Sequence, residues 1–228
     1  MTLAERVQQY IEFQVDGAPI FIDDIVRALK EEMGEDEKKL RQNVTVTCSR
    51  LLTKLDGFSR FDVGIYYYTT RPDGDINRKE LTRQLYIENK RGDVYGSLIC
   101  GSLAFHHGLT DEQPEHKQIM TNNWRRAPKC SEEEGLKLVA PYEEITPKNV
   151  RYFEILELIK WDPTFVDEEK TRSKLIELIS RYELQSIRLM SFAVSHYNQK
   201  VVLALAKLAP FYLQEMHEIS SKDSYTVR

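Results

Sequence analysis

Residues 37–68 decide the fold of this chain and read EKKLRQNVTVTCSRLLTKLDGFSRFDVGIYYY. In the first part, apolar side chains recur at helical spacing, which predicts a helix from Glu37 to Leu55 that ends before Gly57. The residues of this apolar stripe are Leu40, Val44, Cys48, Leu51 and Leu55. In the second part, the turn-prone Asp62-Val63-Gly64 lies between aromatic and β-branched residues and predicts a two-stranded hairpin.

Two shorter helices are expected before this segment. The apolar spacing of residues 3–11 predicts the first, with Thr2 as its N-cap. After a break at residues 16–19 and a short apolar strand, Asp23 is the expected N-cap of the second helix. The order helix, short strand, helix, helix, hairpin is that of a winged helix-turn-helix, which we assign to residues 1–72 as a DNA-binding domain.

A turn-rich linker at residues 69–77 marks the domain boundary, and residues 73–228 are expected to form a mixed α/β domain with a helical C-terminal region. Pro210 is expected to kink or break the last helix. The sequence predicts helices near 78–91, 150–159, 168–182, 185–196 and 199–217, and strands near 116–121 and 136–140. The fold class is therefore α+β and mainly helical.

Composition and charge exclude several classes of protein. The chain has 228 residues, with 32 Lys+Arg against 36 Asp+Glu, so its net charge of −4 provides no global attraction to nucleic acid or anionic membrane. Its three cysteines are odd in number and far apart, which argues against a disulfide framework or a tetrahedral cysteine site. No apolar run approaches the ~20 residues of a membrane span. We expect a reduced, cytoplasmic protein without a membrane partner.

The outer face of the 37–55 helix carries the chemistry of recognition. Arginine and amide side chains read base edges, lysine and hydroxyl side chains reach phosphates or sugars, and Val46 can contact a thymine methyl group or a second subunit. Between Lys38 and Arg60 there are six basic residues and one acid, a local charge of +5. The predicted DNA-binding residues are Lys39, Gln42, Asn43, Val46, Ser49, Arg50, Thr53 and Lys54, with Arg60 of the hairpin on the flanking backbone.

Two other interpretations of these residues stay open. Charged and amide residues on the outer face of a helix are also the ordinary solvated condition, and winged helices also serve as protein-interaction or regulatory modules without direct DNA binding. If the chain is a protein-interaction module, its binding surface would be the second domain, complementary to a basic partner. That surface would consist of the acidic runs at 132–134 and 143–144 and the C-terminal helices.

The sequence predicts neither an enzyme nor a bound cofactor. It contains no phosphate-binding loop, nucleophile elbow or dinucleotide fingerprint. His106, His107 and His116 lack the spacing of a metal site, because adjacent histidines on a helix point ~100° apart. We expect polar residues at a helix end instead, and we expect Cys48 to be an inert core thiol.

Several short motifs resemble a known family. They are Ser49-Arg50-Leu51, Gly64-Ile65-Tyr66-Tyr67, the run from Tyr95 to Ala104 (YGSLICGSLA), His107-Gly108-Leu109-Thr110, Pro114 and Thr121-Asn122. Together with the winged helix that precedes them, they resemble the AbiEi-like antitoxins of bacterial type IV toxin–antitoxin systems, which act in abortive infection, a form of phage defence. The similarity covers roughly Leu3 to Tyr182, and the helices after Gln185 have no match in the family pattern.

The resemblance implies a function. The winged helix would bind inverted repeats in the promoter of its own operon and repress transcription, which is autoregulation. The second domain would oppose a cognate nucleotidyltransferase-like toxin, and the two proteins need not form a stable complex.

Overall fold

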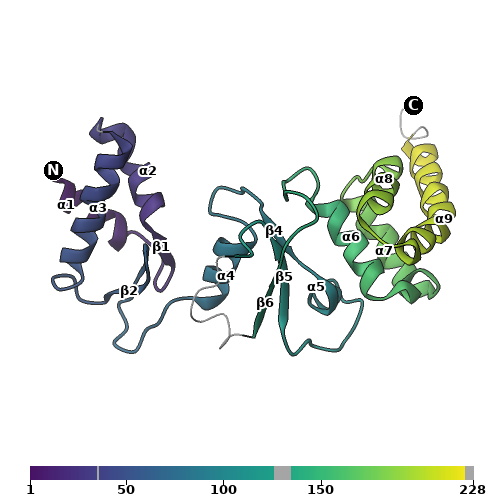
Figure 1. The fold of residues 1–228 in the computed structure, drawn as a ribbon, viewed down its shortest axis with the longest axis horizontal. Coiled ribbons are helices and arrows are strands. Elements are labelled where there is room, and N and C mark those ends of the chain that lie inside the picture. The colour runs from purple at the N-terminus through teal and green to yellow at the C-terminus, as the bar shows by residue number, and fades with distance from the viewer. Residues whose placement is uncertain (35, 126–134, 224–228) are drawn as a thin grey trace. The chain divides into compact units, whose positions relative to one another are not determined.

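The computed structural model describes residues 1–34, 36–125 and 135–223 (Figure 1). The fold is α+β and mainly helical, which confirms the predicted class. The chain forms two compact units, Met1–Gln84 and Leu85–Arg228, here called the N-terminal and C-terminal units. The division falls inside helix α4 (Arg78–Tyr86), whereas we predicted it between residues 72 and 73. None of the helices in the described ranges is long and apolar enough to cross a membrane.

The N-terminal unit has its elements in the predicted order of helix, strand, two helices and hairpin. Strand β3 is central and pairs antiparallel with both β1 and β2. The three helices pack on one another, as Figure 1 shows. The elements are α1 (Leu3–Glu12), β1 (Pro19–Phe21), α2 (Ile22–Met33), α3 (Glu37–Leu51), β2 (Phe58–Asp62) and β3 (Ile65–Tyr68).

The first two helices begin differently. Thr2 caps α1 as predicted, and it forms a capping box because its hydroxyl accepts from the Glu5 amide while the Glu5 carboxylate accepts from the Thr2 amide. The prediction that Asp23 caps α2 is wrong. The chain enters α2 directly from β1, so Phe21 is the N-cap without a side-chain hydrogen bond, and Asp23 lies in the first turn, where it pairs with Arg41 of α3.

Helix α3 ends at Leu51, one turn before the predicted Leu55. Residues 52–55 continue as a turn, in which the amides of Lys54 and Leu55 both donate to the Leu51 carbonyl. Gly57 then has φ +81°, and a β-carbon there would lie 2.0 Å from the Thr69 carbonyl oxygen. Only glycine fits this close approach, so Gly57 fixes where the chain leaves α3 and enters the hairpin.

The C-terminal unit joins a small mixed sheet to a helical group (Figure 1). In the sheet, β5 is central, antiparallel to β4 and parallel to β6. Besides α4, which spans the division, the elements are β4 (Gly96–Leu98), α5 (Cys100–His106), β5 (Lys117–Thr121), β6 (Leu136–Val139), α6 (Val150–Trp161), the 3-10 turn η1 (Pro163–Val166), α7 (Glu169–Arg181), α8 (Ser186–His196) and α9 (Gln199–Asp223).

Most elements of this unit lie where the sequence places them, with two differences. Helix α4 ends at Tyr86, five residues before the predicted Arg91, and α9 continues as one helix through Pro210 to Asp223. The acidic run at 132–134 lies outside the described residues. In the second acidic run, the Glu143 carboxylate accepts a hydrogen bond from the Asn149 side-chain amide at 2.9 Å, so it is bonded within the unit.

Helix α6 is the centre of the C-terminal unit, and two of its buried residues are acidic. Glu154 accepts from the Ser97 hydroxyl at 2.6 Å and from Arg151 at 2.6 Å. Glu157, which is 1% exposed, accepts from Lys160 at 3.1 Å. Because each carboxylate has a hydrogen-bonding cation beside it, burial does not leave an unpaired charge.

Several residues that carry the family resemblance have structural roles. Gly96 is required because a β-carbon would lie 1.8 Å from the Tyr86 carbonyl oxygen. The Thr121 hydroxyl donates to the Tyr95 carbonyl at 3.1 Å. The Asn122 side chain binds Ile145 twice, donating to its carbonyl at 2.9 Å and accepting from its amide at 2.8 Å. These contacts fasten the connection before α6 to the sheet.

Replacing Asn122 by Ala should lower the free energy of unfolding of the C-terminal unit by about 2–4 kcal/mol, because both backbone groups of Ile145 lose their partner. Urea unfolding followed by tryptophan fluorescence reports on this unit alone, since both tryptophans, Trp124 and Trp161, belong to it. Gln199→Ala, at the exposed start of α9, is the control and should change little. Equal stability of the two variants would contradict the prediction.

The stability of the same unit should depend on pH through His107. Burial, followed by the positive charges of His106, Arg151, Lys174 and Arg181, lowers the pKa of His107 from 6.5 to about 4. Because the unfolded chain binds this proton more readily, the contribution is complete above about pH 6.5 and is lost as the pH falls toward 4.

His107→Gln should therefore reduce the difference in unfolding free energy between about pH 7 and pH 4.5 by about 2 kcal/mol. The same substitution at the exposed His116, which is not among the charges that act on His107, is the matched control. A pH dependence that both variants share with the wild type would show that His107 is not its source.

Candidate nucleic-acid interface

Helix α3 has one buried and one exposed face. Its buried face consists of Leu40, Val44 and Cys48, each 0% exposed, and Leu51. The opposite face is exposed over its whole length, and Val46 at its centre is 48% exposed. All predicted site residues of this segment lie at the surface: Lys39, Gln42, Val46, Ser49, Arg50, Thr53 and Lys54 are exposed, and Asn43 is partly buried at the edge. Thr53 and Lys54 lie in the turn after α3.

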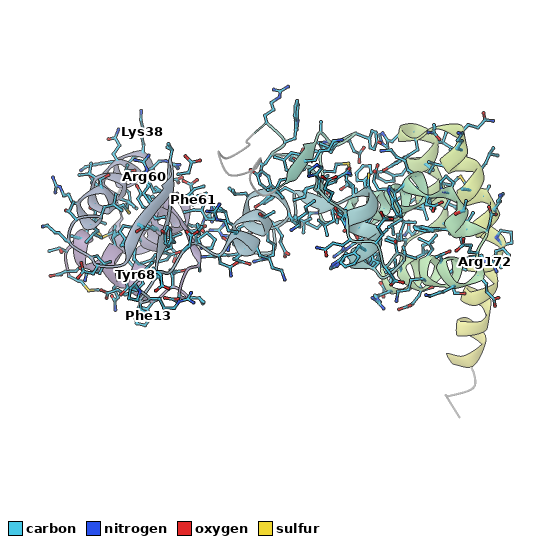
Figure 2. The ribbon with its side chains drawn as sticks, turned by 90° about the horizontal axis from the view of Figure 1, so that it is seen from below. Phe13, Lys38, Arg60, Phe61, Tyr68 and Arg172 are labelled. Carbon is cyan, nitrogen blue, oxygen red and sulfur yellow. The ribbon has the colours of Figure 1, made fainter. Side chains whose placement is uncertain are left out.

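Arg60 of β2 is exposed and lies on the hairpin opposite a tyrosine that Ser49 of α3 also approaches. Across the hairpin, Arg60 is opposite Tyr66, whose ring stacks on Phe58 with centroids 5.3 Å apart. Burial raises the pKa of the Tyr66 phenol, while the Arg60 charge and the Ser49 hydroxyl lie close enough to lower it. Tyr66 therefore links the hairpin cation to α3. Figure 2 labels Arg60 on the hairpin and Lys38 on α3.

The cations around α3 differ in whether they are paired. Arg41 forms an ion pair with Asp23. Within the described residues, Lys39, Arg50 and Lys54 form no ion pair, and Arg60 only donates from Nε to the Asp62 carbonyl at 3.2 Å. Unpaired cations gathered on one face of an acidic chain produce a local positive potential that attracts a polyanion.

The two hydroxyl residues of the site already use their hydrogens. Ser49 donates to the Thr45 carbonyl at 2.9 Å, and Thr53 donates to the Arg50 carbonyl at 3.0 Å. They could donate to a phosphate only by exchanging these bonds, which makes them weaker candidates than the cations.

The start of α3 is acidic. The Asp36 carboxylate caps the helix by accepting from the amides of Lys38 and Lys39 at 3.0 and 3.1 Å, and Glu37 forms an ion pair with Lys30. The Asp36 carboxylate thus already occupies the helix N-terminus, where the helix dipole would otherwise favour a phosphate, so attraction of a phosphate backbone depends on the cations nearer the hairpin.

The structure adds two exposed residues that our list of site residues omitted. Lys38 belongs to the same basic segment and is exposed at the edge of the face. Val63, at the tip of the hairpin, is 73% exposed. Lys38 is part of the basic segment in the sequence, and Val63 belongs to the predicted turn, so both signals were present in the sequence. Cys48 is buried as predicted, and burial raises the pKa of its thiol to about 12.

Comparison with known proteins does not show a family for this chain. No protein-family model and no curated protein matches it. Among solved structures, it is similar to the RV2827C protein from Mycobacterium tuberculosis, with 16% sequence identity and a TM-score of 0.36 over 91% of this chain and 82% of that one. A likeness at this level supports no functional assignment.

The exposed face of α3 should contribute little to stability. Val46→Ala should change the local free energy of unfolding by less than about 0.5 kcal/mol, whereas Leu40→Ala, on the buried face, should lower it by about 2–5 kcal/mol. Hydrogen exchange of the α3 amides measures both effects within the N-terminal unit. A large loss in Val46→Ala would mean that this residue packs against the unit and is not free for a ligand.

Proposed function

We propose that the N-terminal unit is a winged helix that binds double-stranded DNA, with α3 in the major groove and the β2–β3 hairpin as its wing. The observation that carries the proposal is the exposed face of α3, on which cations without an ion pair in the described residues gather beside amide side chains, in a chain of net charge −4. The element order and the central position of β3 support it. The chain would act as a transcriptional repressor of its own promoter at inverted repeats.

The chemistry of the face assigns a role to each group. Arg50 suits guanine, and Gln42 and Asn43 suit adenine, because these side chains bond two atoms of one base edge. Val46 suits the methyl group of thymine. Lys39, Lys54 and Arg60 suit phosphates on either side of the groove. The acidic start of α3 favours deeper insertion of the end that carries Arg50.

For the C-terminal unit we propose the antitoxin role in a type IV toxin–antitoxin system. It is supported by the resemblance of the motifs between Tyr95 and Asn122. The partner would be a nucleotidyltransferase-like toxin encoded beside it. Co-expression of the two genes tests this role: growth should be restored by the wild-type chain and equally by the Arg50→Ala variant, because that substitution abolishes repression without changing the C-terminal unit.

DNA binding should distinguish base-reading residues from phosphate-binding residues. We expect a preference of ~10³-fold or more for a duplex from the upstream region over a scrambled duplex, with a steep salt dependence, in fluorescence anisotropy. Arg50→Ala should cost about 1–3 kcal/mol on the upstream duplex and relax specificity. Lys54→Ala should weaken binding to both duplexes and reduce the salt slope by about one.

The matched control is Lys148→Ala, which removes one charge from an exposed lysine of the C-terminal unit. It should leave affinity and salt slope unchanged. If Arg50→Ala and Lys54→Ala also leave them unchanged, α3 does not present its outer face to DNA. The solvated-face and protein-interaction interpretations would then take precedence.

A further inference from the structure

A pocket of about 440 Å³ opens in the C-terminal unit between α5 and the chain that leads into β5. Its volume falls in the range of small-molecule sites. Leu98, Phe105 and Pro114 form its apolar part. Ser102, His106, Gln113 and Lys117 form its polar part.

The walls of this pocket are held in place by hydrogen bonds. The Ser102 hydroxyl on α5 accepts from the Gln118 amide of β5 at 3.0 Å and donates to the His116 carbonyl at 3.3 Å. The Ile99 amide donates to the Gln118 carbonyl at 3.0 Å. The first turn of α5 and the residue before it are thereby bonded to β5 and its approach, so a ligand would meet a site that is already formed.

Two polar side chains of the pocket, His106 and Gln113, have unused hydrogen-bonding capacity. His106 and Gln113 are exposed, and neither has a hydrogen-bond partner for its side chain within the described part of the chain. Each side chain can offer both a donor and an acceptor. Lys117 adds a cation at the start of β5, and the carboxylates of the neighbouring loop, Asp111 and Glu112, do not line the pocket.

The apolar part offers a stacking surface. Phe105 is 42% exposed although it is a large aromatic residue. An exposed phenylalanine ring beside proline and leucine favours a planar ligand, because aromatic rings stack on flat π systems.

We propose that this pocket binds a nucleotide, with the base stacked on Phe105, its edge bonded to Gln113 and His106, and its phosphate beside Lys117. A purely apolar ligand would bury these polar groups without partners, and a simple anion would not use Phe105. The same chemistry is offered by a free mononucleotide and by the terminal nucleotide of a single-stranded RNA. This inference goes beyond the proposed function and does not depend on DNA binding by α3.

The test is isothermal titration calorimetry of the full chain with the four ribonucleoside monophosphates, the corresponding nucleosides, inorganic phosphate and a six-nucleotide single-stranded RNA. We expect saturable binding of at least one nucleotide, at least tenfold tighter than that of its nucleoside or of phosphate. Binding of phosphate as tight as that of every nucleotide, or no saturable binding of any probe, would overturn the proposal.

Two variants locate the site. Phe105→Leu keeps an apolar side chain without the ring and should weaken nucleotide binding about tenfold. Lys117→Gln should weaken nucleotide binding more than nucleoside binding. Lys148→Gln is the control, and tryptophan fluorescence confirms that each variant is folded. Wild-type affinity in both Phe105→Leu and Lys117→Gln would place the ligand elsewhere and overturn the proposal.

The remaining measurements distinguish a free nucleotide from an RNA strand end, and they test the nucleotide proposal independently of the DNA-binding proposal. RNA binding at least tenfold tighter than that of the best mononucleotide would identify a strand end as the ligand, and equal or weaker RNA binding would identify the free nucleotide. The titrations are repeated in Arg50→Ala, which removes the cation of the α3 face and should leave nucleotide binding unchanged. Failure of the wild-type chain to bind duplex DNA, with nucleotide binding intact, would count only against the DNA-binding proposal.

Discussion

The N-terminal unit depends on the burial of one stripe of α3. Leu40, Val44 and Cys48 are fully buried, and Tyr66, stacked on Phe58, closes the same core from the hairpin. Because successive residues of a helix are ~100° apart, burying this stripe directs the opposite one outward. Phe58 and Tyr66 of the hairpin belong to the same core, so the hairpin that carries Arg60 is tied to the buried side of α3. Burial of this one apolar stripe therefore determines which residues of α3 are exposed as the candidate interface.

Periodicity predicted the helices well, because burial of one face imposes it. The predictions failed where contacts distant in sequence decide the local structure. Asp23 looks like a cap, yet β1 leads directly into α2 and the carboxylate pairs with Arg41. Residues 94–107 form strand β4 and then helix α5, a division that small apolar residues do not reveal. In this segment the Tyr86 carbonyl leaves no room for a side chain at Gly96. Because Tyr86 is distant in sequence, the local pattern around Gly96 does not reveal this constraint.

The candidate interface was more predictable than the pocket for a physical reason. The predicted residues of α3 lie on one continuous helix, so their common exposure follows from spacing alone. The pocket instead joins Leu98, α5 and the loop before Lys117, which meet only because β4 pairs with β5. Sequence reasoning gave His106 no role beyond a helix end, since the pairing that brings Gln113 near it has no signature in the chain.

The segment that resembles the antitoxin family contains two groups of polar residues, which differ in whether their side chains are hydrogen-bonded within the fold. The Ser97 hydroxyl bonds to Glu154, and the Asn122 side chain bonds to the backbone of Ile145. These two residues therefore stabilise the fold and are poor candidates for binding a ligand. His106 and Gln113 lie in the same segment without a hydrogen-bond partner for their side chains in the described chain, beside an exposed Phe105. Polar side chains with free hydrogen-bonding groups beside an exposed aromatic ring are typical of a ligand site. Whatever this segment recognises is therefore expected at the pocket and not at the residues that hold the sheet together.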